Sequence, residues 1–262
     1  MSVAPLFFVS HGSPMFAVGT GEAADNLAKQ SKRLDSVQAI LVISPHWITH
    51  GNVVSTNEQP ETVHDFGGFP DCLYRLQYPA LGSGYIGHKI ISLLQKSGLN
   101  ARADDARGWD HGAWVPLLHL YPKADKPVVQ VSLNTRMSMD ELDQLGQVLN
   151  QLRKQNIAVI CSGSLTHNLY DMSMIHDEVA EYAIKFEGWA REKVLAGNLK
   201  YLKEAHIKSV HYNKSHPTSE HFLPLLIAMA ASNKADTVGV LKSPILHRTI
   251  SMESYVWSRN DE

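Results

Sequence analysis

The sequence has few cysteines, few charged residues and no long apolar run. Only Cys72 and Cys161 are cysteines among 262 residues, and their separation forms neither a CxxC metal motif nor a disulfide framework. Charged residues make up 19% of the chain with a net charge of −2, and no basic stripe indicates nucleic-acid binding. No segment approaches the roughly 18 apolar residues of a membrane helix, and the N-terminus does not resemble a signal peptide. We therefore expect a cytoplasmic protein that binds neither nucleic acid nor membranes.

Several common catalytic motifs are missing as well. No GxGxxG follows an expected strand, residues 19–21 lack the Lys-Ser/Thr ending of a phosphate loop, and residues 163–167 do not form a GxSxG elbow. The local histidine pattern is also not of the HExxH type. These absences argue against a dinucleotide-binding fold, a phosphate-loop enzyme and a serine hydrolase.

Apolar segments alternate between the periods of strands and helices. With 44% hydrophobic residues, the chain is long enough for one large domain, which we place over residues 1–262. Expected strands cover residues 7–10, 37–44, 52–56, 127–133, 157–161, 237–241 and 254–257. Expected helices cover residues 21–34, 83–96, 138–155, 174–195 and 218–231, with a further apolar helix ending at 121 and irregular surface chain over 197–219. This order predicts an α/β fold with a central, mostly parallel sheet flanked by helices.

Histidine is the residue in excess, with 14 copies, and three of them follow apolar strands. His11 comes after residues 7–10, His46 after residues 37–44, and His167 after residues 157–161, each through small or turn-forming residues. In open α/β sheets, ligands bind at the carboxyl ends of the strands. The three histidines are therefore expected at one shared site.

A metal ion requires neutral imidazole nitrogens on rigid supports, and strand ends and first helical turns provide them. His11, His46 and His221, the last expected in the first turn of its helix, are the candidate ligands. His167 is either a fourth ligand or an acid/base beside the metal. For each histidine taken alone, the alternative is an ordinary structural or surface residue.

Several motifs in one order give the chain a resemblance to a known family. They are residues 11–14 (HGSP), 44–47 (SPHW), 64–70 (HDFGGFP), 78–79 (YP), 82–83 (GS), 108–112 (GWDHG), 162–169 (SGSLTHNL) and 220–225 (EHFLPL). The sequence resembles the class III, or LigB-type, extradiol ring-cleaving dioxygenases, and more closely their DOPA dioxygenase branch. The resemblance extends through nearly the whole chain.

The resemblance implies one divalent metal ion per chain, held by His11, His46 and His221 at the carboxyl ends of the strands. The protocatechuate-cleaving branch of this class has a carboxylate where this chain has His221. A ligand set with a carboxylate suits non-haem Fe(II), whereas zinc also accepts an all-histidine set. We expect Fe(II) to support activity, with Zn(II) as an alternative bound or native metal.

The same resemblance implies that a catechol and O2 are the small-molecule substrates. His167 is expected as the acid/base, His111 and His64 as residues that position substrate or oxygen, and Phe66, Phe69 and Trp109 as walls around the ring. Two other functions remain open from the residues: a non-enzymatic metal-binding protein of the same fold, and a zinc hydrolase. A hydrolase would need a carboxylate base, for which Asp65 and Asp110 are the candidates in the motifs. No sequence feature sets an oligomeric state.

Overall fold

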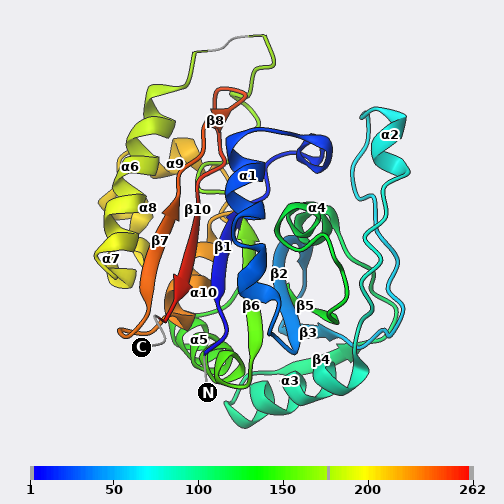
Figure 1. Cartoon of the computed structure of the whole chain (residues 1–262). Coiled ribbons are helices and arrows are strands. Elements are labelled where there is room, and N and C mark those ends of the chain that lie inside the picture. Colours follow the sequence, from blue (N-terminus) through cyan, green and yellow to red (C-terminus); the bar gives the residue numbers. More distant parts are fainter. Residues whose placement is uncertain (1–2, 176–177, 260–262) are drawn as a thin grey trace.

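A single eight-stranded sheet forms the centre of the molecule (Figure 1). The computed structural model describes residues 3–175 and 178–259; the predicted domain 1–262 also includes residues 1–2, 176–177 and 260–262, which lie outside the described residues. In spatial order the strands are β4 (Ala101–Asp104), β3 (Asn52–Ser55), β5 (Val128–Leu133), β2 (Ala39–Ile48), β6 (Ile157–Gly163), β1 (Leu6–Ser10), β10 (Ser254–Ser258) and β7 (Thr237–Leu241). Strands β5, β2, β6 and β1 run parallel, whereas β3 with β5, β1 with β10 and β10 with β7 pair antiparallel. The predicted α/β fold with a mostly parallel sheet is confirmed.

Helices cover both faces of this sheet (Figure 1). The helices of the described residues are α1 (Glu22–Ala28), α2 (Asp71–Tyr74), α3 (Gly84–Lys96), α4 (His111–Leu120), α5 (Met139–Lys154), α6 (Glu181–Leu195), α7 (Leu199–Lys203), α8 (Ala205–Lys208), α9 (Tyr212–Ser215) and α10 (Leu223–Ala231), with 3-10 turns at η1 (Pro14–Val18) and η2 (Ser31–Leu34). A separate two-stranded sheet contains β8 (Ile245–Leu246) and β9 (Ile250–Ser251).

Alternation along the central strands explains why they are apolar throughout. In β1, Leu6 and Phe8 belong to the core that includes α5 and α10, whereas Phe7 and Val9 belong to the core that includes α1 and α4. Because successive strand residues point to opposite faces, a sheet covered on both faces needs apolar residues at nearly every position. These runs are what identified the strands in the sequence.

Two helix starts follow from local capping. The hydroxyl of Ser138 accepts from the backbone N–H of Glu141, and the Glu141 carboxylate accepts from the Ser138 N–H, so the predicted capping box at α5 is confirmed. Ser83 caps α3 by accepting from the N–H of Ile86.

Four expectations outside the sheet are wrong, one of them the helix expected from 218, which begins at Leu223. The helix expected over 21–34 divides into α1 and the 3-10 turn η2. The helix expected from 174 begins at Glu181, and residues 176–177 within its expected range lie outside the described residues. The irregular chain expected over 197–219 contains α7, α8 and α9, because single apolar residues such as Leu202 and Ala205 anchor very short helices to the core. Such short helices leave no periodic signal.

The carboxyl ends of the central strands meet at one edge of the sheet. Ser10, the last residue of β1, pairs with Gly163, the last residue of β6, so the segments that follow these strands begin side by side. The pairing of β2 with β5 shifts register between Ser44 and Ile48, which places His46 in the irregular end of β2. Among the described residues, no helix is both long and apolar enough to span a bilayer.

Candidate metal centre

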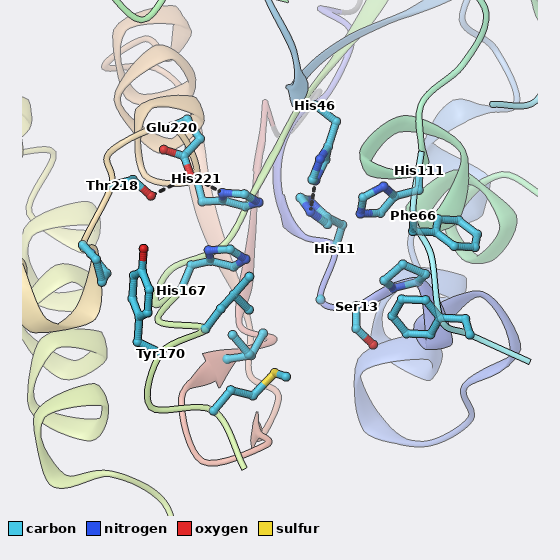
Figure 2. Close-up of a pocket in the computed structure, with 17 residues that line it drawn as sticks. His11, Ser13, His46, Phe66, His111, His167, Tyr170, Thr218, Glu220 and His221 are labelled. Carbon is cyan, nitrogen blue, oxygen red and sulfur yellow. Dashed lines mark hydrogen bonds and ion pairs between the residues drawn. The ribbon is translucent and has the colours of Figure 1, made fainter. Parts of the chain in front are cut away.

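A cavity of about 560 Å³ opens at this edge, within the usual range for small-molecule pockets. Five histidines from separate segments line it, and Figure 2 shows their side chains directed into it. The lining residues are His11, Gly12, Ser13, Pro14, His46, Phe66, Phe69, His111, His167, Leu169, Tyr170, Met172, Pro217, Thr218, Glu220, His221 and Ile250. The structure therefore brings all four histidines of the predicted metal site together, along with His111.

His11 follows β1 directly, and its hydrogen bonds define its tautomer. The Ser162 hydroxyl donates its one proton to the carbonyl oxygen of Gly112, so its oxygen accepts from His11 Nδ1–H at 2.9 Å. The Nε2 of His11 then bears a lone pair, and this atom is hydrogen-bonded to His46 Nε2 at 3.1 Å. A neutral imidazole whose lone pair has a fixed direction is what a metal ion requires.

The same arrangement holds for His221, which lies two residues before α10 rather than in its first turn as expected. Its Nδ1–H donates to Glu220 Oε1 at 2.9 Å, and its Nε2 is buried without a hydrogen-bond partner among the described residues. An unpartnered buried nitrogen is unfavourable unless a ligand satisfies it. Many metal-bound histidines use one ring nitrogen as the ligand and donate a hydrogen bond from the other to a carboxylate. His221 has this arrangement, with Nδ1–H bound to Glu220 and Nε2 without a partner among the described residues.

Asp65 connects the other two histidines of the pocket. Its Oδ1 accepts from both the backbone N–H and the Nδ1–H of His111, at 2.9 and 3.0 Å, and its Oδ2 lies 3.7 Å from His46 Nδ1. Burial raises the pKa of Asp65, but the hydrogen bonds and charge of His111 outweigh it and lower the pKa to about 2. An ionised Asp65 thus faces His46 and His111 at neutral pH.

The three candidate ligands are neutral at physiological pH. Burial, followed by neighbouring histidines, lowers the pKa values of His11 and His221 well below the ordinary 6.5, and burial with the nearby His111 lowers that of His46 to about 4. One nitrogen from each of these three residues lies within 4.8 Å of the others. The residues present therefore fit a divalent cation: three neutral, converging donors and an unpartnered Nε2 on His221.

His167, after β6, lies against this set rather than within it. Its ring stacks on that of His221, with centroids 3.6 Å apart and an interplanar angle of 8°. Burial lowers the pKa of His167 to about 4, so the ring is neutral at pH 7 and has an acceptor nitrogen. Its backbone N–H is held by the carbonyl oxygen of Ser215.

Buried polar residues beneath His46 hold its end of β2 in place. Asp110 accepts from Ser44, Arg107 and Gln130, and the Ser44 oxygen accepts from the His46 N–H at 3.2 Å. Gly112 lies against the same group, because a Cβ atom at this position would lie 2.7 Å from the His46 ring. The hydrogen bonds of this network, and the fact that residue 112 is a glycine, therefore fix the position of His46.

The remaining predicted residues divide into two groups. Phe66 and Phe69 line the pocket, as does His111. His64 does not line it: its ring contacts Phe66 and Trp114, and its Nε2 lies 3.1 Å from the carbonyl oxygen of Leu76. Trp109 is completely buried in the core on the α4 side of the sheet, outside the pocket lining, contrary to the expectation that it walls the ring.

Other lining residues had no role in the sequence prediction. Leu169, Tyr170, Met172 and Ile250 form much of the apolar wall, and Glu220 is the side chain that orients His221. Glu220 had a detectable signal, since an acidic residue beside a candidate ligand histidine is a common metal-site pattern. The apolar wall had none, because its residues come from irregular chain and from β9.

Comparison with known proteins gives consistent matches over nearly the whole chain. Residues 5–257 match the family model described as the catalytic LigB subunit of aromatic ring-opening dioxygenase. The 4,5-DOPA dioxygenase extradiol of Beta vulgaris is 36% identical over 232 residues, covering 87% of each chain. The protein of that name in Escherichia coli (strain K12) is 34% identical over 261 residues, covering 95% of this chain and 93% of its own. A crystal structure of an uncharacterized protein from Escherichia coli K12 matches with a TM-score of 0.81 and 27% identity, covering 97% of this chain and 99% of that one.

Proposed function

The chain belongs to the LigB family, the catalytic subunits of aromatic ring-opening dioxygenases, and on this premise we propose its metal, its substrate and the roles of its residues. The protein is a metal-dependent extradiol dioxygenase, which opens an aromatic ring with O2 beside its two hydroxyls. We therefore do not propose the alternative of a non-enzymatic metal-binding protein. A hydrolase is disfavoured too, because Asp65 and Asp110 already accept hydrogen bonds from their neighbours and neither is a free base.

His11, His46 and His221 would hold one divalent ion. The observation that supports this is the convergence of three neutral imidazoles beside an apolar cavity, with the Nε2 of His221 unpartnered among the described residues. When bound, the ion supplies Lewis acidity toward the two ring oxygens and a path for electrons between the ring and O2. Because Zn(II) has no redox chemistry, we propose Fe(II) for activity and Zn(II) as a bound but inactive alternative.

A substituted catechol of the DOPA type is the proposed substrate. The support is chemical and comparative: the pocket presents flat apolar surface at Phe66 and Phe69, and the relatives named above carry DOPA dioxygenase names. Both atoms of O2 enter the product, so the balanced reaction is catechol plus O2 to a ring-opened semialdehyde acid. The proposed location of the protein is the cytoplasm.

His167 is the proposed acid/base. Its neutral ring lines the pocket and can accept a proton from a catechol hydroxyl and return it to an oxygen atom during ring opening. His111, held by Asp65 through Nδ1–H, has Nε2 available to position substrate or oxygen. Phe66 and Phe69 would contact the ring, whereas His64 supports Phe66 from outside the pocket lining and Trp109 packs in the core.

The decisive experiment is anaerobic loading of the metal-free protein with Fe(II), followed by addition of L-DOPA and then air. We expect oxygen uptake together with a yellow ring-opened product. Protein loaded with Zn(II) should bind its ion with similar stoichiometry but consume no oxygen. Absence of both signals with the Fe(II) protein, for L-DOPA and for other catechols, would refute the proposed substrate and metal together.

A further inference from the structure

A further histidine, His216, is buried beside the site but lies outside the pocket lining. It follows α9, is 3% exposed, and packs its ring against those of Phe186, Tyr212 and Phe222, with centroids 5.5, 5.6 and 5.1 Å away. A phenylalanine would fill such an apolar site without the cost of burying a polar group. The use of an imidazole here is therefore explained by the hydrogen bond that it makes.

That hydrogen bond goes to the backbone of the segment after β6. The Nε2 atom of His216 lies 2.9 Å from the carbonyl oxygen of Leu165, and because a carbonyl oxygen can only accept, Nε2 carries the proton and donates it. Burial lowers the pKa of His216 to about 4, which keeps the ring neutral at pH 7, and its Nδ1 has no hydrogen-bond partner among the described residues. The side chain is thus a donor to one backbone carbonyl, two residues before His167.

This bond is one of three that tie the segment carrying His167 to the segment carrying His221. The N–H of His167 donates to the carbonyl oxygen of Ser215 at 2.8 Å, and the N–H of Ser164 donates to that of His221 at 3.0 Å. The bond from His216 falls between these two along the first segment. Because the other two bonds are between backbone groups, the bond from His216 is the one that a substitution can remove.

The three bonds determine how the ring of His167 lies on that of His221. The two rings stack with centroids 3.6 Å apart (Figure 2). A general acid/base has to lie within hydrogen-bond reach of the proton that it moves, about 2.6–3.2 Å between heavy atoms. Misplacement by about 1 Å can cost on the order of 100-fold in rate. Movement of the Leu165 carbonyl would shift the chain directly before His167 and carry its ring away from this position.

We propose that His216 is a positioning residue for the acid/base: by donating to the carbonyl oxygen of Leu165, it holds the ring of His167 in place beside the metal centre. This inference rests on the proposed function, because it concerns a proton transfer of that reaction. The ligand histidines are oriented by other partners, the Ser162 hydroxyl and the Glu220 carboxylate. Loss of the bond from His216 should therefore slow turnover and leave the ion bound.

The main test compares His216→Phe with His216→Gln. Phenylalanine keeps an aromatic ring in the same apolar site but removes the N–H, whereas the amide of glutamine offers an N–H at a similar distance from the backbone. With the Fe(II)-loaded protein and L-DOPA, His216→Phe should lower kcat by about 10–100-fold with little change in KM or metal content. His216→Gln should recover most of the lost kcat. Equal kcat values for the two variants, or loss of the ion from His216→Phe, would overturn the proposal.

Asn150→Leu is the matched control for a general loss of stability. Asn150 also donates from its side chain to a backbone carbonyl, that of Ala231 at 2.9 Å, but it does so between α5 and the end of α10, outside the pocket lining. This variant should leave kcat unchanged. In His216→Phe, slower proton transfer should also raise the ratio of kcat in ordinary water to kcat in heavy water. A similar fall of kcat in Asn150→Leu, or an unchanged solvent ratio in His216→Phe, would overturn the proposal.

The hydrogen bond can also be tested in the original protein. Nitrogen NMR of the imidazole groups in the Zn(II)-loaded protein should show His216 as the neutral Nε2–H tautomer at pH 7, with its signal identified by its absence from the spectrum of His216→Gln. The Nδ1–H tautomer would overturn the proposal even if His216→Phe does not fold. Lack of turnover by the Fe(II)-loaded original protein, with L-DOPA and with other catechols, would instead refute the proposed function, whereas the tautomer of His216 would still be read from the spectrum.

Discussion

The rings of His167 and His221 stack face to face, with centroids 3.6 Å apart and planes inclined by only 8°. The lone pair of an imidazole nitrogen lies in the plane of its ring, so two rings stacked in this way direct their lone pairs along separate parallel planes. Nitrogens of His167 and His221 lie within 4.8 Å of each other and of a Glu220 oxygen, as do those of His11, His46 and His221 among themselves, so it is the direction of the lone pairs rather than proximity that separates the two sets. This relationship favours an acid/base role for His167 over a fourth ligand.

Replacement of His167 by alanine should therefore separate chemistry from metal binding. We expect His167→Ala to retain the metal content of the original protein while turnover falls by about 10²–10⁴-fold, the usual effect of losing a general acid/base. Metal analysis and oxygen uptake on the same preparation measure both quantities. His50→Ala, at an exposed histidine, is the matched control and should change neither. Loss of the ion from His167→Ala would make this residue a ligand.

Gly112 provides a test of how tightly His46 is placed. An alanine Cβ at residue 112 would meet the His46 ring at 2.7 Å and would also crowd Ser44, so one of these groups must move. We expect Gly112→Ala to weaken metal affinity by about 10–100-fold, as for other changes behind metal ligands. Competition with a chromogenic chelator would measure this.

The control for that substitution is Gly188→Ala. Gly188 lies inside α6, and an added Cβ there has no neighbour within 4 Å. Alanine replaces glycine in a helix with a gain of about 0.5–1 kcal/mol, so this variant should be slightly more stable with unchanged metal affinity. Equal affinities for the two variants would show that His46 tolerates displacement.

Metal affinity should depend only weakly on pH over the range where free imidazole titrates. Burial and the nearby His111 lower the pKa of His46 from 6.5 to about 4, and the pKa values of His11 and His221 are lowered too. A lowered pKa keeps each ring neutral at pH 5.5, so protons compete poorly with the ion. Three ordinary imidazoles would instead lose roughly 10³-fold in affinity at that pH. Zn(II) titrations at pH 7.5 and 5.5 distinguish these outcomes, and a thousandfold loss would contradict the lowered pKa values.

The sequence located much of this site because the signals are local. His11 and His46 stand beside turn residues at the ends of apolar strands, and parallel strands must end at a common edge. The sheet was predictable for the same reason, since both faces are buried. The short β4 was missed, because its four residues include exposed Arg102 and carry no apolar run.

Side-chain direction in loops could not be predicted in the same way. Trp109 and His111 are two residues apart, yet only His111 reaches the pocket, because a bridge between Thr62 and Trp109 holds the backbone there and the indole packs into the core. His64 likewise turns toward the carbonyl oxygen of Leu76. Such orientations depend on partners far away in the chain, and no local pattern contains them.

A buried ion pair between Arg153 and Asp236 ties α5 to the chain just before β7. The two guanidinium nitrogens lie 2.7 and 3.1 Å from the two carboxylate oxygens, and both side chains are fully buried. Asp236→Ala would leave the Arg153 charge buried without its carboxylate, so we expect the free energy of unfolding to fall by about 3–5 kcal/mol in urea titrations. Asp35→Ala, which breaks the exposed pair with Lys123, should cause no measurable change. Similar stability of the two variants would mean that water or another group compensates Arg153.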